Sequence, residues 1–203
     1  MGFGTLFIGY FLLLNIFNYA YTDLIAGLIM LLGAYKLSAV SPEFKKGFWI
    51  LIPYSALGAY EIVAEIINMF KLTSENPIIT GTIGILRCAL LGLASFFILS
   101  GIKNLALELE LWRLRDKAKS SKISVITAYG IALILEIPAL DKLIPTEALA
   151  VIALLSLVFS FAVTVYVLTA IYSAYMHICM PEDIIREENR SREAIKKQNR
   201  KKG

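Results

Sequence analysis

Residues 47–70 read GFWILIPYSALGAYEIVAEIINMF, an apolar run in which the only charged side chains are Glu61 and Glu65. A helix needs about 20 predominantly apolar residues to cross the hydrocarbon core of a bilayer, which is roughly 30 Å thick. This run is long enough to do so, and its two acids stand in its second half. The stretch predicts a transmembrane helix that carries carboxylates inside the membrane.

Further apolar runs lie on both sides of this stretch. We place six predicted helices near residues 3–19, 22–39, 47–70, 79–103, 122–140 and 147–179. Hydrophobic residues make up 58% of the chain and charged residues 18%, whereas an average soluble domain is about 25% charged. A soluble fold of 203 residues could not bury that much apolar surface. Because the runs also lack the short alternating pattern of membrane barrels, the sequence predicts an all-α integral membrane protein.

The charges of the connecting segments predict the orientation. Most cations outside the tail fall beside the even-numbered connections: Lys36, Lys45, Lys46, Arg113, Arg115, Lys117, Lys119 and Lys122. Lys71 and Lys142 fall on the other side. Since loops rich in Lys and Arg stay in the cytoplasm, both termini should be cytoplasmic and the six helices should form three consecutive hairpins. We therefore expect a multi-pass plasma-membrane protein in contact with the lipid bilayer.

Two segments are expected outside the membrane. The fourth helix should continue into the cytoplasm to about residue 118, because Leu and Glu are good helix formers. Residues 104–115 would then carry apolar stripes on two sides. Such a helix could lie between its own bundle and a second surface, which is either a partner or the lipid headgroups, or it could pack wholly within the protein. Residues 1–180 would form the membrane domain and 181–203 a charged helical tail. A protein partner would bind at the helix 104–118 and the tail.

Ionisable groups inside predicted spans are the candidate functional residues, because they are costly in lipid unless paired or hydrated. Glu61, Glu65, Arg87 and Glu136 are four such groups, and helix rise places all of them ~5–10 Å outside the midplane. Arg87 can form a bidentate pair with one carboxylate, most simply that of Glu61. That would leave Glu65 and Glu136 to be protonated, hydrated or bound to a cation.

Polar residues at helical spacing extend this candidate site. Tyr54 and Asn68 share the face of Glu61 and Glu65 on one helix, and Tyr129 shares the face of Glu136 on another. The sequence thus predicts a polar site for a solute or cation in the outer half of the bundle.

The pattern favours a transport component and leaves a scaffold or regulatory subunit with structural ion pairs as the alternative. An intramembrane enzyme is a third alternative, which we do not favour because no protease, nucleophile-elbow, phosphate-loop or dinucleotide motif occurs. No catalytic residue is assigned. Two cysteines and one histidine make no recognisable metal site, so no metal or cofactor is expected. The net charge of +4 is confined to loops and the tail, which does not favour a nucleic-acid partner.

The predicted orientation can be checked with reporter fusions. Fusions after residues 75 and 145 should report the outside, and fusions after 44, 118 and 203 the cytoplasm, because nearly all loop cations lie on the cytoplasmic side. Alkaline phosphatase and fluorescent-protein activities of each fusion give the readout. An external location for residue 118 would contradict both the orientation and the depths above.

Overall fold

The computed structural model describes residues 2–14, 20–69, 77–135 and 145–179. Within these ranges the regular structure is helical and contains no strand. The helices are α1 (Gly2–Leu12), α2 (Ala20–Leu37), α3 (Pro42–Met69), α4 (Pro77–Glu108), α5 (Trp112–Leu135) and α7 (Thr146–Ala174), followed by the π-helical segment η1 (Tyr175–Cys179). The predicted tail, residues 181–203, lies outside the described residues.

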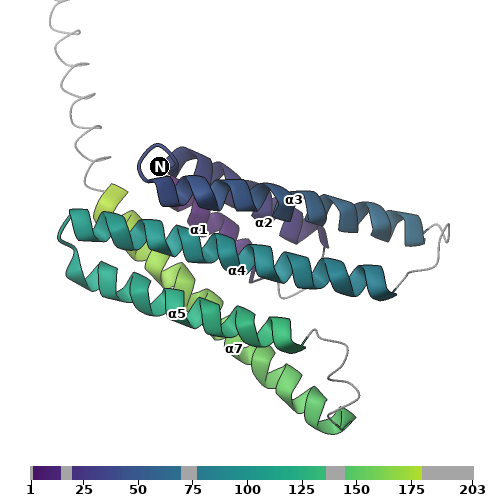
Figure 1. The fold of residues 1–203 in the computed structure, drawn as a ribbon. Coiled ribbons are helices and arrows are strands. Elements are labelled where there is room, and N and C mark those ends of the chain that lie inside the picture. The colour runs from purple at the N-terminus through teal and green to yellow at the C-terminus, as the bar shows by residue number, and fades with distance from the viewer. Residues whose placement is uncertain (1, 15–19, 70–76, 136–144, 180–203) are drawn as a thin grey trace, which may run out of the picture.

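The six α-helices of the described residues form a ring of neighbours, which Figure 1 shows from the side. Each helix packs against the next in the order α1, α2, α3, α4, α5 and α7, and α7 returns to pack against α1 as well as α4. Among the described residues, four segments are long and apolar enough to cross a membrane: Pro42–Asn68, Gly81–Glu108, Trp112–Leu135 and Val151–Ile178. The predicted all-helical architecture is confirmed for the described residues, and four of their helices are compatible with a membrane protein. The six spans stay a prediction, since α1 is only 11 residues long. The orientation also stays a prediction.

The extension of the fourth helix to about residue 118 was a wrong prediction. Helix α4 ends at Glu108, and α5 begins at Trp112 inside the basic segment. The turn between them is a Schellman motif, in which the Leu111 N–H donates to the carbonyl of Ala106 and the Glu110 N–H to that of Leu107. Glu110 takes the left-handed conformation, with φ of 56°, that this motif usually gives to glycine. The chain therefore reverses where a continuous two-faced helix was expected.

The two ends of the ring differ in packing. The buried core lies mainly at the end that holds the α4–α5 turn and includes Phe3, Phe44, Ile98, Ile102, Leu114 and Ile171. At the opposite end the helices diverge (Figure 1). There the first half of α7 is uncovered, and the exposed fractions of Leu154 and Leu157 reach 63% and 67%. A helix that is apolar all round and uncovered by protein fits contact with lipid.

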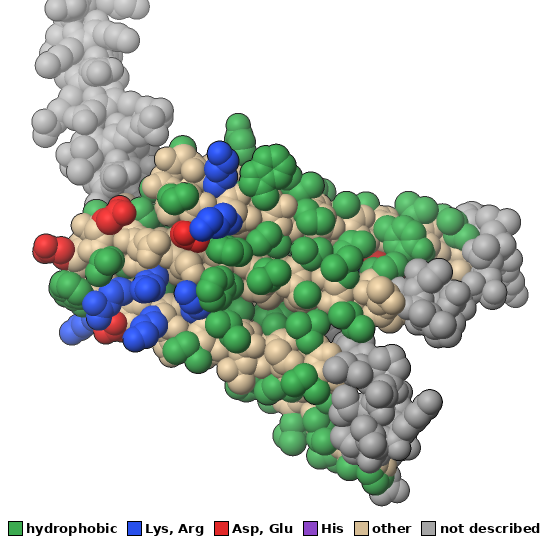
Figure 2. All heavy atoms as spheres, in the orientation of Figure 1, with side chains coloured by type: hydrophobic (Ala, Val, Ile, Leu, Met, Phe, Trp, Pro, Cys, Tyr) green, Lys and Arg blue, Asp and Glu red, His purple; other side chains and the backbone are tan. Residues whose placement is uncertain are grey.

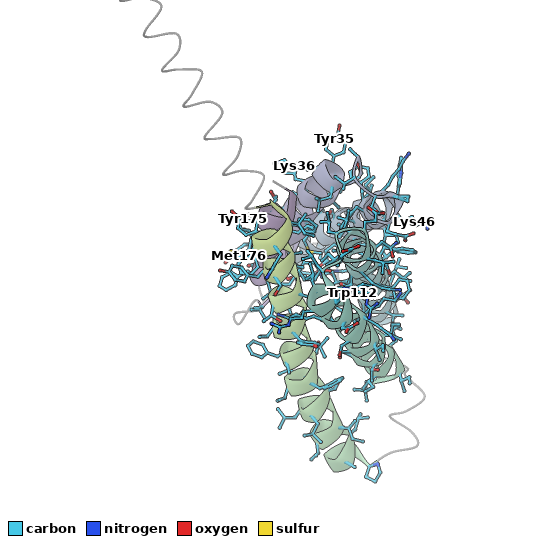
Figure 3. The ribbon with its side chains drawn as sticks, turned by 90° about the vertical axis from the view of Figure 1, so that its left-hand side faces the viewer. Tyr35, Lys36, Lys46, Trp112, Tyr175 and Met176 are labelled. Carbon is cyan, nitrogen blue, oxygen red and sulfur yellow. The ribbon has the colours of Figure 1, made fainter. Side chains whose placement is uncertain are left out.

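Positive charge gathers at the well-packed end, which we call the basic end (Figure 2). The view onto this end shows Lys36 of α2, Lys46 of α3 and Trp112 of α5 distributed around the ring (Figure 3). Aromatic side chains between the lysines are typical of the membrane–water interface. The other end, which we call the open end, is the end where α3 finishes and α4 begins.

Helices α1 and α2 approach closely at Gly33, which gives a stability prediction. A Cβ at Gly33 would lie 2.8 Å from the backbone nitrogen of Leu6, which cannot move aside without shifting α1. Gly33→Ala should therefore destabilise the protein by about 1–3 kcal/mol. Gly81→Ala is the matched control, because nothing lies within 4 Å of its Cβ position. Thermal unfolding in detergent would contradict the packing if both variants melted alike.

Candidate functional site

Arg87 of α4 joins three helices near the open end. Its Nη2 donates to Oδ2 of Asp23 on α2 at 2.7 Å, and its Nη1 donates to Oε2 of Glu61 on α3. The three side chains are only 16–26% exposed. A guanidinium has a planar set of donors that can serve two carboxylates at once. We call these three residues the Arg87 cluster.

The ring of Tyr54 packs beside the guanidinium. The Cζ atom of Arg87 lies 5.5 Å from the centroid of that ring, which is within the range of a cation–π contact. Tyr54 is only 2% exposed, so the aromatic ring shields the arginine from solvent. The Arg87 Nε is buried and has no hydrogen-bond partner, so the two carboxylates do not satisfy all of its donors.

A cavity of about 360 Å³ lies against the Arg87 cluster. Its polar lining side chains come from α2, α3, α4, α5 and α7: Asp23, Tyr54, Arg87, Tyr129, Ser160 and Thr164. Small-molecule sites typically enclose about 300–1,000 Å³ and place a few polar groups on a largely apolar wall. The cavity falls at the small end of that range.

The wall of the cavity includes two small residues of α4. Nothing lies within 4 Å of the Cβ position of Gly84, so this residue leaves open space beside the guanidinium. The thiol-bearing residue Cys88 lies one turn further along the same helix and also lines the cavity. A Cβ added at Gly84 would therefore enter open space in the wall.

A hydrogen bond across the ring lies deeper than the cavity. The hydroxyl of Tyr10 on α1 donates to Oγ of Ser95 on α4 at 2.6 Å, and Ser95 donates to the carbonyl of Leu91 in its own helix. Leu91 also lines the cavity. This buried chain of donors holds α1 against α4 where the packed half of the ring begins.

The predicted site residues come together only in part. Glu61 pairs with Arg87 as predicted, but through Nη1 alone and not as a bidentate pair, because Nη2 donates to Asp23. Tyr54, Arg87 and Tyr129 line the cavity. The side chain of Glu65 is exposed, so the expected inward orientation of this residue is not found. The half-buried Asn68 does not line the cavity, and Glu136 lies outside the described residues.

Asp23 is the member of the Arg87 cluster that the sequence does not predict. An acid in the first turn of a helix is a common partner of the helix dipole, so it attracted no separate interpretation. The signal that could have found it is position: the chain enters α2 at the same end at which Glu61 and Arg87 stand.

Within the described residues, no group of three or more His, Cys, Asp or Glu could hold a metal ion.

Stability measurements can test the cluster. Arg87→Leu should cost about 3–5 kcal/mol, because it leaves two carboxylates facing each other without a cation. Adding Glu61→Leu should recover part of this loss, and adding Asp23→Asn as well should recover most of it. Glu65→Gln should leave the melting temperature unchanged, since its side chain is exposed. Thermal unfolding in detergent would refute the pairing if Arg87→Leu alone were as stable as the triple variant.

No family model, curated protein or solved structure matches the chain. Function is therefore inferred from the arrangement of the side chains themselves.

Proposed function

We propose that the protein is a membrane transport component that binds a small cationic solute in the cavity beside the Arg87 cluster. The observation that carries the proposal is the pairing of two carboxylates with one guanidinium on the edge of a cavity near the open end. The cluster has one negative charge in excess. In a low-dielectric site that charge is costly unless a cation or a proton neutralises it.

The composition of the cavity also supports a cationic solute. Asp23 lines the cavity directly, so its carboxylate is available to a ligand while it still pairs with Arg87. Tyr129 adds an aromatic ring, which favours organic cations, and Ser160 and Thr164 add hydroxyl oxygens. The solute class that fits is a small organic ammonium or guanidinium ion.

The packing of the ring supports access from one side. The helices are packed tightly at the basic end and diverge at the open end (Figure 1). A solute would then enter from the open end, which the positive-inside rule orients away from the cytoplasm. Release on the other side would require the tightly packed half to open.

A scaffold with structural ion pairs is the second candidate function. The observation that favours it is that both terminal nitrogens of Arg87 are already paired, so that the cluster ties α2, α3 and α4 together. The two functions differ in the behaviour of the cavity. A transport site must admit water and solute, whereas a structural cluster remains sealed.

The thiol of Cys88 can report access to the cavity. With Cys179→Ser removing the other cysteine, a water-soluble methanethiosulfonate reagent should modify Cys88 in the membrane-embedded protein. Guanidinium or methylammonium chloride should slow the reaction in the parent protein but not in an Asp23→Asn variant. Gly84→Leu should also slow it by filling the cavity, and Gly81→Leu, one turn away and outside the lining, is the control.

Binding itself can be measured through stability. A ligand at ten times its Kd should stabilise the parent protein by about 1.4 kcal/mol, which thermal unfolding with chloride salts of methylammonium and guanidinium can detect. Glu65→Gln should keep this effect, because its side chain is exposed, and Asp23→Asn should lose it. A cysteine that never reacts, together with no cation-dependent stabilisation, would exclude the transport proposal and favour the scaffold.

A further inference from the structure

Two lysines and two phenylalanines form a row across α3, α4 and α5 near the basic end. The Nζ of Lys46 lies 5.5 Å from the ring centroid of Phe97, and the Nζ of Lys122 lies 4.0 Å from that of Phe96. The two rings are adjacent on α4, with centroids 5.4 Å apart. The row thus places an ammonium group on each side of one strip of α4.

A third lysine stands on the same strip, closer to the basic end. Lys103 follows Phe96 by seven residues, which is two helical turns, and it lies near enough to Lys122 for their charges to repel. The acid of this surface is Glu43, which pairs with Lys46 at 3.0 Å. Three ammonium groups and one carboxylate leave two positive charges in excess. We call Lys46, Lys103 and Lys122 the lysine triad.

An apolar strip continues from the triad toward the middle of the helices. Leu93 and Leu86 of α4 precede Phe97 at helical spacing and are 50% and 48% exposed. On α5, Ile123 and Ile126 are also more than half exposed. The surface therefore has cations at one end and exposed apolar side chains at the other. This arrangement is complementary to an amphipathic ligand with an anionic head group.

We propose that the lysine triad and this apolar strip bind one anionic phospholipid of the leaflet at the basic end. The phosphate lies in the positive field of the triad, and the acyl chains lie over Leu93 and Leu86. The charge complementarity, and the position of the triad at the ends of the apolar runs 47–70, 79–103 and 122–140, favour a lipid over a soluble anion. None of the residues of the triad or the strip belongs to the Arg87 cluster or lines its cavity, so the proposal does not depend on the proposed solute site.

The test compares anionic and neutral lipids on the full-length protein. Dioleoyl phosphatidylglycerol and dioleoyl phosphatidylcholine are titrated into the protein in a neutral detergent, and apparent affinities are taken from thermal unfolding. The parent protein should prefer the anionic lipid. Lys103→Gln with Lys122→Gln should reduce that preference about 25-fold, at about fivefold for each lysine near an anionic headgroup.

Two further variants make the result decisive. Lys36→Gln with Lys45→Gln removes the same charge from the same end but outside the triad, and it should keep the preference to within about twofold. Lys46→Gln changes a side chain that is 55% exposed, so it should reduce the preference for the anionic lipid about fivefold without disturbing the fold. This variant decides the question if Lys103→Gln with Lys122→Gln does not fold.

The proposal is overturned by any of three results. The first is that the triad variants keep the preference for the anionic lipid. The second is that the control double variant loses as much of that preference as the triad double variant, which would indicate unspecific attraction to charge. The third is that soluble glycerol phosphate stabilises the protein as strongly as phosphatidylglycerol at the same concentration, which would indicate a site for a free phosphate.

Discussion

An arginine in a helix that is apolar enough to span a membrane is costly unless an opposite charge lies beside it, and the arrangement of the open half follows from that constraint. Arg87 meets it with carboxylates from two other helices, which fixes the positions of α2, α3 and α4 relative to one another. Breaking such a pair costs several kcal/mol, because it strands a charge in low dielectric. Apolar contacts in lipid give no comparable preference for one helix partner over another, since lipid tails are equally apolar.

At the basic end the ring depends on close packing. Gly33 lets α1 approach α2, and the hydrogen bond between Tyr10 and Ser95 ties α1 to α4. Small residues and buried hydroxyl pairs are the contacts that associate helices in membranes. Lys103 and Lys122 lie at the level of this packed region but are partly exposed, so their stems can cover apolar surface while their ammonium groups reach water or headgroups. Packing and charge thus distinguish the two ends of one helix ring.

The sequence predicts the Arg87–Glu61 pair because opposite charges at similar depth on consecutive helices have few other partners. Asp23 escapes notice because an acid in the first turn of a helix is common whether or not it has a distant partner. Glu65 shares a helical face with Glu61, yet it is exposed, and helical periodicity carries no information on how far the neighbouring helices extend beside α3.

The break between α4 and α5 escapes prediction for a local reason. Residues 104–115 contain no glycine or proline, and Leu and Glu both favour helix. Glu110 nevertheless adopts the left-handed conformation, at a cost of about 1–2 kcal/mol for a residue with a side chain. Tertiary packing outweighs this cost, because ending α4 here lets Leu114 of α5 reach the core. Such a turn depends on contacts made far along the chain rather than on the residues that form it.

The ion pairs also determine which helices can move. They hold α2, α3 and α4 near the cavity, whereas on the opposite wall Thr164 donates to the carbonyl of Ser160 in its own helix, α7. A side-chain hydrogen bond between α5 and α7 joins Lys117 to Ser173, close to the basic end. Regions with few buried contacts open at the lowest free-energy cost. Widening the cavity therefore costs least by displacing the uncovered half of α7, and the charged wall stays in place while it does so.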